Sequence, residues 1–497
     1  MSAIPPIDEL NPAPSREALV AMLCAILPEE AVLSQSEALA PYECDGLPAY
    51  RQQPLVVCLP ETVEQVQQLL ALCHEQRVPV VARGAGTGLS GGALPLANGV
   101  LLSLAKFTRI LEVDINNCIA RVEPGVRNLA ISQAVAKHNL YYAPDPSSQI
   151  ACSIGGNVAE NSGGVHCLKY GLTVHNVLGL KMISMEGELL EIGGAGLDSS
   201  GYDLLALMHG SEGLLGVIVE VTVKLLPIPE CVQVLLASFD DVVSAANVVG
   251  EIIAEGIVPA GLEMMDGPAI RAAEDFIHAG YPRDAAAILL CEIDGSEAEV
   301  EVQLKTIKHL LSVGGAVEIL VASEAEDRQR LWAGRKAAFP AVGRLAPDYY
   351  CMDGTIPRRR LAEVLQKISD WSGEYGLDVV NVFHAGDGNL HPLILYDANN
   401  PGELEQVEEF GGKILELCVA VGGTITGEHG VGIEKLNQMC VQFGAQELVQ
   451  FHALKDAFDM RGLLNPGKAV PTLHRCAEFG ALHVHKGAVP FPDLERF

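Results

Sequence analysis

The chain has 497 residues, which at about 150 residues per domain indicates roughly three domains. Its 63 Asp and Glu outnumber its 33 Lys and Arg, and the formal net charge of −30 excludes a nucleic-acid binder that works by neutralising phosphates. Hydrophobic residues form 49% of the chain and charged residues 19%, a composition typical of a folded protein with large buried cores.

Helix and strand patterns alternate through the first half. A Pro-rich lead-in over 1–50 contains a predicted helix over 15–27. Apolar spacing predicts a helix over 61–77, and a Val-rich strand follows over 78–82, which Pro79 restricts to a sheet edge or a strand start. The remaining predicted elements are strands over 99–104, 119–122 and 213–226 and a helix over 128–138. Two prolines at 227 and 229 then break the chain, so we expect a first domain over 51–229.

The second half shows the same mixture and is expected to form an α+β domain over 230–470 with an antiparallel sheet. Its predicted strands cover 232–238, 288–293, 317–320, 377–383 and 392–396. Its predicted helices cover 241–255, 297–311, 404–421 and 445–458. Residues 471–497, rich in His, Pro and Phe, are expected to be a tail.

The thirteen cysteines are scattered, and no C-x-x-C pair occurs. The sequence therefore predicts neither a zinc ribbon nor an iron–sulfur cluster within this chain, and we expect reduced, mostly buried thiols in a cytoplasmic protein. The first residues lack the basic start and apolar run of a signal peptide. Apolar stretches fall well short of the roughly 20 residues that cross a bilayer, so no direct membrane insertion is expected.

Two glycine-rich segments, over 83–92 and 144–164, indicate a ligand site built from backbone amides, because closely spaced glycines let N–H groups converge on an anion such as pyrophosphate. The G-x-G-x-x-G spacing at Gly86, Gly88 and Gly91 does not predict a Rossmann site, because Gly92 and Pro95 follow where a helix would have to start. An ordinary glycine-rich loop is the alternative. Two such segments about seventy residues apart suit one extended dinucleotide held at two places.

These segments resemble the FAD-binding domain of the vanillyl-alcohol oxidase and p-cresol methylhydroxylase superfamily, in which FAD lies between two α+β subdomains. The resemblance implies noncovalent FAD, because Thr87 stands where some members have the histidine that bonds to the flavin. The residues expected to contact FAD are Arg83, Gly84, Ala85, Gly86, Thr87, Gly88, Leu89, Ser90, Pro144, Asp145, Ser148, Gly155, Gly156, Asn157, Asn161, Gly163, Gly164, Val217, Ile218 and Asn465.

A histidine–acid cluster is the strongest chemical signal in the second half. His384 and His391 flank a Gly-Asp-Gly-Asn turn between two predicted strands, and opposed hairpin residues have Cβ atoms about 4.5–5.5 Å apart. Glu428 and His429 lie in a later glycine-rich segment; if Glu428 turned towards a metal, His429 would face elsewhere and be free to transfer a proton. Two imidazoles and a carboxylate suit Zn, Mn or Fe, but a plain turn with polar histidines remains an equal alternative at this point.

The same motifs resemble those of the flavin-dependent D-2-hydroxy-acid dehydrogenases. The resemblance implies that His384, His391 and Glu428 hold a divalent metal and that His429 is the base. It also implies that Arg335 grips the substrate carboxylate; the alternative is a solvated helix arginine.

Three further segments, 42–47, 348–355 and 472–480, resemble the flavin subunits of bacterial glycolate oxidases. Tyr350 and Cys351 stand where 2-hydroxyglutarate enzymes have a lysine for the second carboxylate, which favours a monocarboxylate. The resemblance implies oxidation of glycolate to glyoxylate, and also of D-lactate to pyruvate. It implies a second flavin-type subunit and an iron–sulfur subunit as partners, with any contact to the inner face of the membrane made through them. A stand-alone D-lactate dehydrogenase and a non-catalytic, flavin-carrying scaffold are the alternatives.

Overall fold

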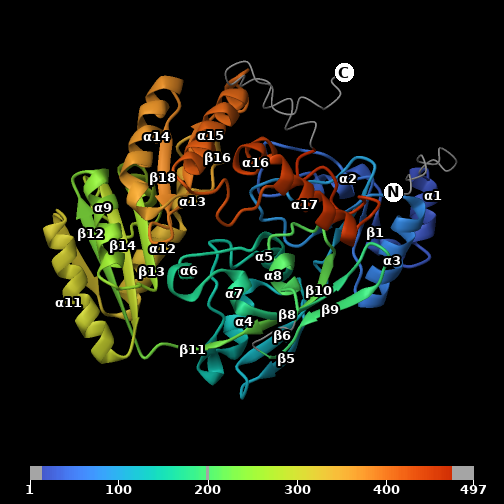
Figure 1. Cartoon of the computed structure of the whole chain (residues 1–497), viewed down its shortest axis with the longest axis horizontal. Helices are drawn as coiled ribbons and strands as arrows, with labels where there is room; N and C mark the ends of the chain where they lie inside the picture. Colours follow the sequence, from blue (N-terminus) through green and yellow to red (C-terminus); the bar gives the residue numbers. More distant parts are fainter. Residues whose placement is uncertain (1–13, 197–200, 473–497) are drawn as a thin grey trace.

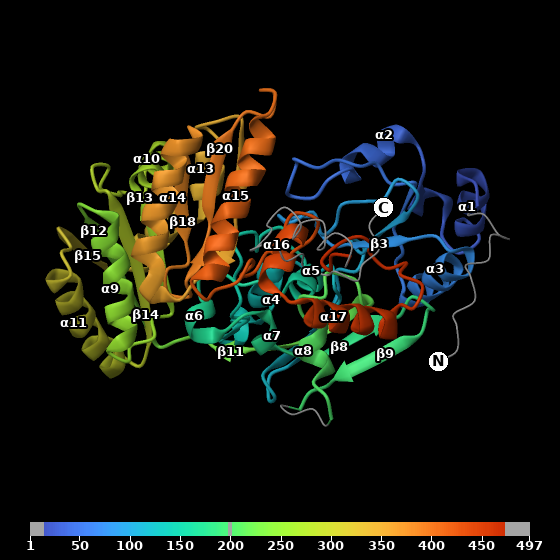
Figure 2. The same cartoon turned by 45° about the horizontal axis from the view of Figure 1, so that its top comes forward.

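The structure, a computed structural model, describes residues 14–196 and 201–472. All but the first two residues of the expected tail over 471–497, and with them most of the segment 472–480, lie outside the described residues. Figure 1 shows the first half of the chain on one side and the second half on the other, with helices α16 and α17 returning over the first half; Figure 2 shows the same arrangement from a tilted view. The two halves therefore share a long contact.

The first half contains two main sheets. One has the order β1-β2-β4-β3, in which β3 is parallel to β4 and lies at the edge, with Val80 directly after Pro79. The other is antiparallel, with the order β5-β6-β10-β8-β9. The strands are β1 (Val32–Leu33), β2 (Val56–Cys58), β3 (Val80–Arg83), β4 (Val100–Ser103), β5 (Ile110–Asp114), β6 (Ile119–Val122), β7 (Leu140–Tyr141), β8 (Val177–Ile183), β9 (Leu189–Gly193), β10 (Val217–Lys224) and β11 (Leu226–Pro227), of which β7 pairs with β11.

The second half is built on a seven-stranded antiparallel sheet with the order β15-β12-β14-β13-β18-β20-β16. Along β12, Leu235 and Ala237 contact one hydrophobic core while Val234 and Leu236 contact another, so both faces of the sheet are covered. The strands are β12 (Cys231–Phe239), β13 (Gly261–Asp266), β14 (Ala287–Gly295), β15 (Glu318–Ala322), β16 (Asp348–Cys351), β17 (Gly354–Thr355), β18 (Val379–Phe383), β19 (Asn389–Leu390) and β20 (Pro392–Tyr396).

Helices cover these sheets. In the first half they are α1 (Arg16–Leu23), α2 (Ser36–Leu39), α3 (Val63–Gln76), α4 (Asn128–Val135), α5 (Ile154–Glu160), α6 (Cys167–Tyr170), α7 (Thr173–Asn176) and α8 (Leu204–Met208). In the second half they are α9 (Val242–Ala254), α10 (Gly267–Ile277), α11 (Glu297–Val313), α12 (Ala325–Lys336), α13 (Ala338–Val342), α14 (Leu361–Tyr375), α15 (Glu403–Ala420), α16 (Leu436–Gln442) and α17 (Ala445–Phe458). Helices α9, α11, α14 and α15 pack on one face of the large sheet, and α10, α12 and α13 on the other.

Local signals explain several helix boundaries. Thr62 and Gln65 form a capping box at the start of α3, and Ser296 and Glu299 form another at the start of α11. The first helix ends at Leu23, earlier than expected, because Cys24 already closes its last turn.

The second glycine-rich segment is partly helical. Gly155 and Gly156 lie in the first turn of α5, and a Cβ on Gly155 would lie 2.6 Å from Cβ of Pro124. Close packing against the preceding loop therefore explains a glycine inside a helix, where it otherwise costs backbone entropy.

The chain does not stay in the second half after residue 230. Leu464 bridges to Val80 of β3, and the Asn465 N–H donates to the Val80 carbonyl (2.8 Å). The chain thus passes from the first half to the second at 227–229 but later returns, because residues beyond α17 pack on the first half.

Candidate flavin and metal site

A long cavity of about 360 Å³ lies between the two halves and joins the glycine segments to the histidine–acid cluster. Lys336, Phe339, His391, Glu428 and His429 line its second-half end. The expected FAD contacts on its wall are Arg83, Gly84, Ala85, Gly86, Thr87, Gly88, Leu89, Ser148, Gly155, Gly156, Asn157, Val217 and Ile218.

The glycine segments form a cradle that a dinucleotide fits. Gly86 and Gly91 have φ of 70° and 76°, a backbone conformation that favours glycine. Any Cβ on Gly84 would collide with the hydroxyl of Ser153. That hydroxyl is buried on the wall without a hydrogen-bond partner among the described residues, as expected for a group that awaits a ligand acceptor.

The other expected FAD contacts are not on the wall. Ser90 accepts backbone bonds from Ile433 and Glu434, and Asn465 donates to Gly92 and Glu212, so both hold neighbouring chain segments. The remaining residues off the wall are Pro144, Asp145, Asn161, Gly163 and Gly164. Asp145, for example, contacts the His166 ring (3.0 Å) instead.

His384, His391 and Glu428 lie together and fit a divalent metal. Glu428 Oε1 is 3.2 Å from His384 Nε2 and 3.4 Å from His391 Nε2. Ligands about 2.0–2.1 Å from a tetrahedral zinc ion are separated from one another by about 3.3 Å. Both ring nitrogens of His391 are buried without a hydrogen bond to the described residues, so the donor set has unused capacity.

Glu263 orients the His384 ring by contacting Nδ1, the nitrogen that faces away from Glu428. Its Oε1 lies 2.7 Å from His384 Nδ1, which leaves Nε2 facing Glu428. Arg335 of α12 donates through Nε to Glu263 Oε2 (2.9 Å), and the Arg335 side chain is only 1% exposed. A carboxylate that fixes the second nitrogen of a histidine is typical of metal sites.

Charges at the cluster favour a cation. Burial opposes charge on His384, but Glu263 and Glu428 hold the pKa of His384 well above its usual value. Burial would raise the pKa of Glu428, yet the hydrogen bond and charge of His384 lower it to about 2. The carboxylates that favour a proton on His384 would equally favour a metal ion beside it.

Asp353, which follows β16, organises the loop that carries Glu428 and His429. It accepts the backbone N–H groups of Gly427 (3.1 Å), Glu428 (3.2 Å) and His429 (2.9 Å). The Lys435 ammonium lies 3.3 Å from the same carboxylate. Although burial acts to raise it, the neighbouring His429 imidazole and Lys435 ammonium hold the pKa of Asp353 well below its usual value. Asp353 lies in the sequence segment 348–355, but nothing in the sequence pattern predicts its role.

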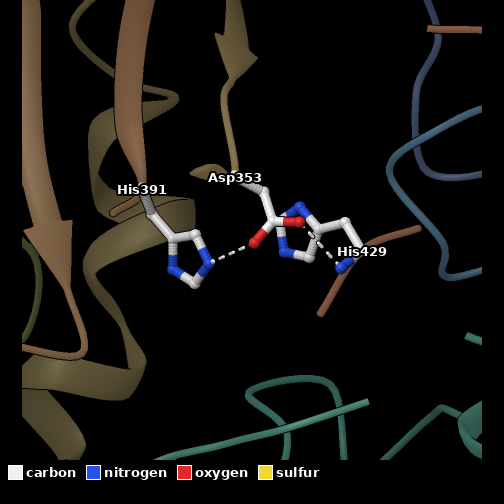
Figure 3. A group of neighbouring side chains, drawn as sticks. All are labelled: Asp353, His391 and His429. Atoms are coloured by element: carbon white, nitrogen blue, oxygen red, sulfur yellow. Dashed lines mark hydrogen bonds and ion pairs between the residues drawn. The ribbon is translucent and has the colours of Figure 1, made fainter. Parts of the chain in front are cut away.

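His429 lies beside the cluster, and the expectation that it faces elsewhere is wrong. Its ring stacks on that of His391 with centroids 4.9 Å apart and an interplanar angle of 7°. Figure 3 shows Asp353 beside both histidines, with dashed lines to His391 Nε2 (3.5 Å) and to the backbone nitrogen of His429 (2.9 Å). Three successive amides can meet one carboxylate only where the backbone curls, so neighbouring side chains no longer alternate as in an extended segment. Asp353, His391 and His429 form a second group with metal-ligand spacing, but the many hydrogen bonds already made by Asp353 favour an anchoring role.

Burial also sets the protonation of His429. Desolvation of its imidazolium lowers the pKa of His429 to about 4, despite the opposing charge of Asp353. The ring is therefore neutral near pH 7 and able to accept a proton.

The hairpin is present, but the two histidines are not opposed. The ladder pairs His384 with Asn389 and Asn381 with Pro392. His391 reaches the cluster from the strand break between β19 and β20, and the ring centroids of the two histidines are 5.1 Å apart.

Comparison with known proteins identifies the class. Residues 54–193 match the FAD binding domain model, and residues 228–469 match the model of FAD linked oxidases, C-terminal domain. A solved structure of p-cresol methylhydroxylase with substrate bound superposes with a TM-score of 0.79 at 19% identity, over 92% of this chain and 97% of that one. The chain is thus an FAD-linked oxidoreductase with the p-cresol methylhydroxylase type of fold.

Curated relatives place it more narrowly. The chain is 64% identical over 491 residues to "Glycolate oxidase subunit GlcD" of Escherichia coli (strain K12), covering 99% of this chain and 98% of that protein. It is 33% identical to a "D-lactate dehydrogenase" of Anaerostipes hadrus, over 84% of this chain and 90% of that one. The chain belongs to the family of the glycolate oxidase subunit GlcD. Among its described residues, no helix has the length and hydropathy needed to cross a membrane.

Proposed function

We propose that this protein oxidises glycolate to glyoxylate, and D-lactate to pyruvate, as the FAD-carrying subunit of a larger enzyme. The proposal depends on one observation above all: a cavity that joins the glycine cradle to the histidine–acid cluster. A hydroxy acid bound at the cluster would then lie next to the flavin. The names of the relatives support both substrates and the subunit role.

The metal site would be formed by His384, His391 and Glu428, with Glu263 fixing the first histidine. A divalent ion bound there would polarise the substrate hydroxyl and carboxylate. Bound FAD would accept the hydride from C2, which carries the electron pair out of the substrate.

The chain's own residues bind and deprotonate the substrate. His429 accepts the hydroxyl proton, since its ring is neutral and on the cavity wall. Arg335, expected to grip the substrate carboxylate, lies off the cavity wall, is 1% exposed and contacts Glu263 through Nε (2.9 Å) and Nη2 (2.7 Å). Its role at the substrate stays a prediction. Lys336, the next residue of α12, adds a positive charge on the wall itself.

We propose a monocarboxylate as the substrate. Tyr350 and Cys351 are 2% and 5% exposed and pack in the two hydrophobic cores of the second half. Neither is on the cavity wall, so neither side chain offers a partner for a second carboxylate.

Anaerobic addition of substrates to the purified, FAD-loaded chain tests the proposal. We expect glycolate and D-lactate to bleach the flavin absorbance and D-2-hydroxyglutarate to leave it unchanged. Bleaching by D-lactate without glycolate would favour a stand-alone D-lactate dehydrogenase. If no hydroxy acid reduces the flavin and the chain contains no metal, the non-catalytic, flavin-carrying scaffold would be favoured.

The flavin should be released by denaturation. Thr87 lies on the cavity wall and cannot form the histidyl bond to FAD that other superfamily members make. We therefore expect acid precipitation to leave nearly all FAD in the supernatant, as measured by its fluorescence. Yellow colour retained in the washed pellet would show a covalent bond elsewhere in the chain.

Reduced flavin needs an electron acceptor, and the sequence contains no cluster motif. We propose that partner subunits, a second flavin-type subunit and an iron–sulfur subunit, take the electrons onward.

A further inference from the structure

The loop over 427–432, which carries Glu428 and His429, is bound from both halves of the molecule. From the second half, Asp353 accepts three of its backbone amides. From the first half, Glu212, located between α8 and β10, accepts the N–H groups of Val431 and Gly432, each at 2.7 Å. Two carboxylates from opposite halves thus hold nearly every amide of this loop.

The first half also contacts Glu428 directly. The Gly163 N–H donates to Glu428 Oε2 (2.8 Å), while Glu428 Oε1 faces the two histidines. A hydrogen bond to one oxygen leaves the other to point at the metal position. Gly163 was expected to contact FAD, but it is absent from the cavity wall and buried against Glu428.

Glu212 occupies an unusual backbone conformation for this task. Its φ is 49°, in the left-handed region that residues other than glycine rarely adopt. The residue is 6% exposed, and Asn465 donates to its carbonyl (2.7 Å). A strained backbone position of this kind persists only where surrounding contacts hold it, and here the hydrogen bonds from the two loop amides do so.

We propose that the FAD-binding half completes the metal site: Gly163 orients Glu428, and Glu212 positions the loop on which Glu428 and His429 lie. Neither belongs to the metal-ligand group; Gly163 lies off the cavity wall, whereas Glu212 lines it, and both are proposed as positioning residues that act through the loop. The inference rests on the metal site proposed above. It follows that metal binding depends on the packing of the two halves, although every ligand belongs to the second half.

Gly163→Ala tests the contact to Glu428. The added Cβ would lie 2.7 Å from Glu428 Oε2 and 3.0 Å from Leu172, so the carboxylate must move. Metal affinity, measured by equilibrium dialysis with Zn²⁺ or Mn²⁺, should fall about 10–100-fold, the range typical of lost outer contacts. The FAD-to-protein ratio should not change. Gly373→Ala is the matched control, because a Cβ at this site in α14 meets nothing within 4 Å.

Glu212→Ala and Glu212→Gln test the loop. Alanine removes both acceptors and should speed amide hydrogen exchange over 427–432 and weaken metal binding. Glutamine keeps one acceptor oxygen and should restore part of both properties. Exchange and metal affinity within twofold of wild type in Glu212→Ala and Gly163→Ala would overturn the inference. If the wild-type chain binds no metal but Glu212→Ala still speeds amide exchange in the loop, the proposed metal site is refuted and the positioning of the loop is not.

Discussion

Replacing His429 with alanine is expected to slow flavin reduction by glycolate about 10²–10⁴-fold, the usual contribution of a positioned general base. The reason is that His429 is the neutral imidazole on the wall beside the cluster, with burial lowering its pKa to about 4. Anaerobic stopped-flow absorbance measures the rate directly.

The control for this variant must show that only the base is lost. FAD and metal content should match wild type, and His309→Ala, an exposed position on α11, should reduce at the wild-type rate. Reduction of the His429→Ala flavin at a near wild-type rate would remove His429 as the base.

Replacing His391 with alanine is expected to abolish metal binding, from about one ion per chain to almost none, and to slow flavin reduction by at least about 10²-fold. Neither nitrogen of its buried ring makes a hydrogen bond to the described residues, and Nε2 lies 3.4 Å from Glu428 and 3.5 Å from Asp353, so the ring is placed to bind a metal. Metal analysis by mass spectrometry and flavin reduction measure the two effects.

Removal of the metal from wild type should reproduce this variant. Dialysis against a chelator is expected to suppress flavin reduction, and added Zn²⁺ or Mn²⁺ should restore it in wild type but not in His391→Ala. Full activity in a preparation with fewer than about one bound ion per hundred chains would contradict the metal site.

Much of the fold follows from local patterns. The apolar spacing before residue 77 predicts α3, and the structure confirms it over Val63–Gln76 with a capping box at Thr62. Pro79 predicts a strand start or edge, and β3 begins at Val80 on a sheet edge. These features depend on short-range spacing and on the missing proline N–H, both of which can be read without knowing the tertiary structure.

Strand β13 could not be found in this way. Its six residues are all buried, but Glu263 and Asp266 interrupt the apolar pattern. These acids are tolerated because Arg335 and His384 reach Glu263 from α12 and from the hairpin. The groups that pair with the buried acid are distant in sequence, so local propensity does not predict this strand.

The sequence by itself determined the class of chemistry: two glycine segments for FAD, and the histidine–acid motifs that His384, His391 and Glu428 supply. The tertiary structure decided how those residues are held. Asp353 curls the loop so that Glu428 and His429 face one site, and Glu212 and Gly163 approach it from more than 200 residues away. Residue type fixes what a side chain can bind, whereas the direction it faces depends on hydrogen bonds between segments that only folding brings together.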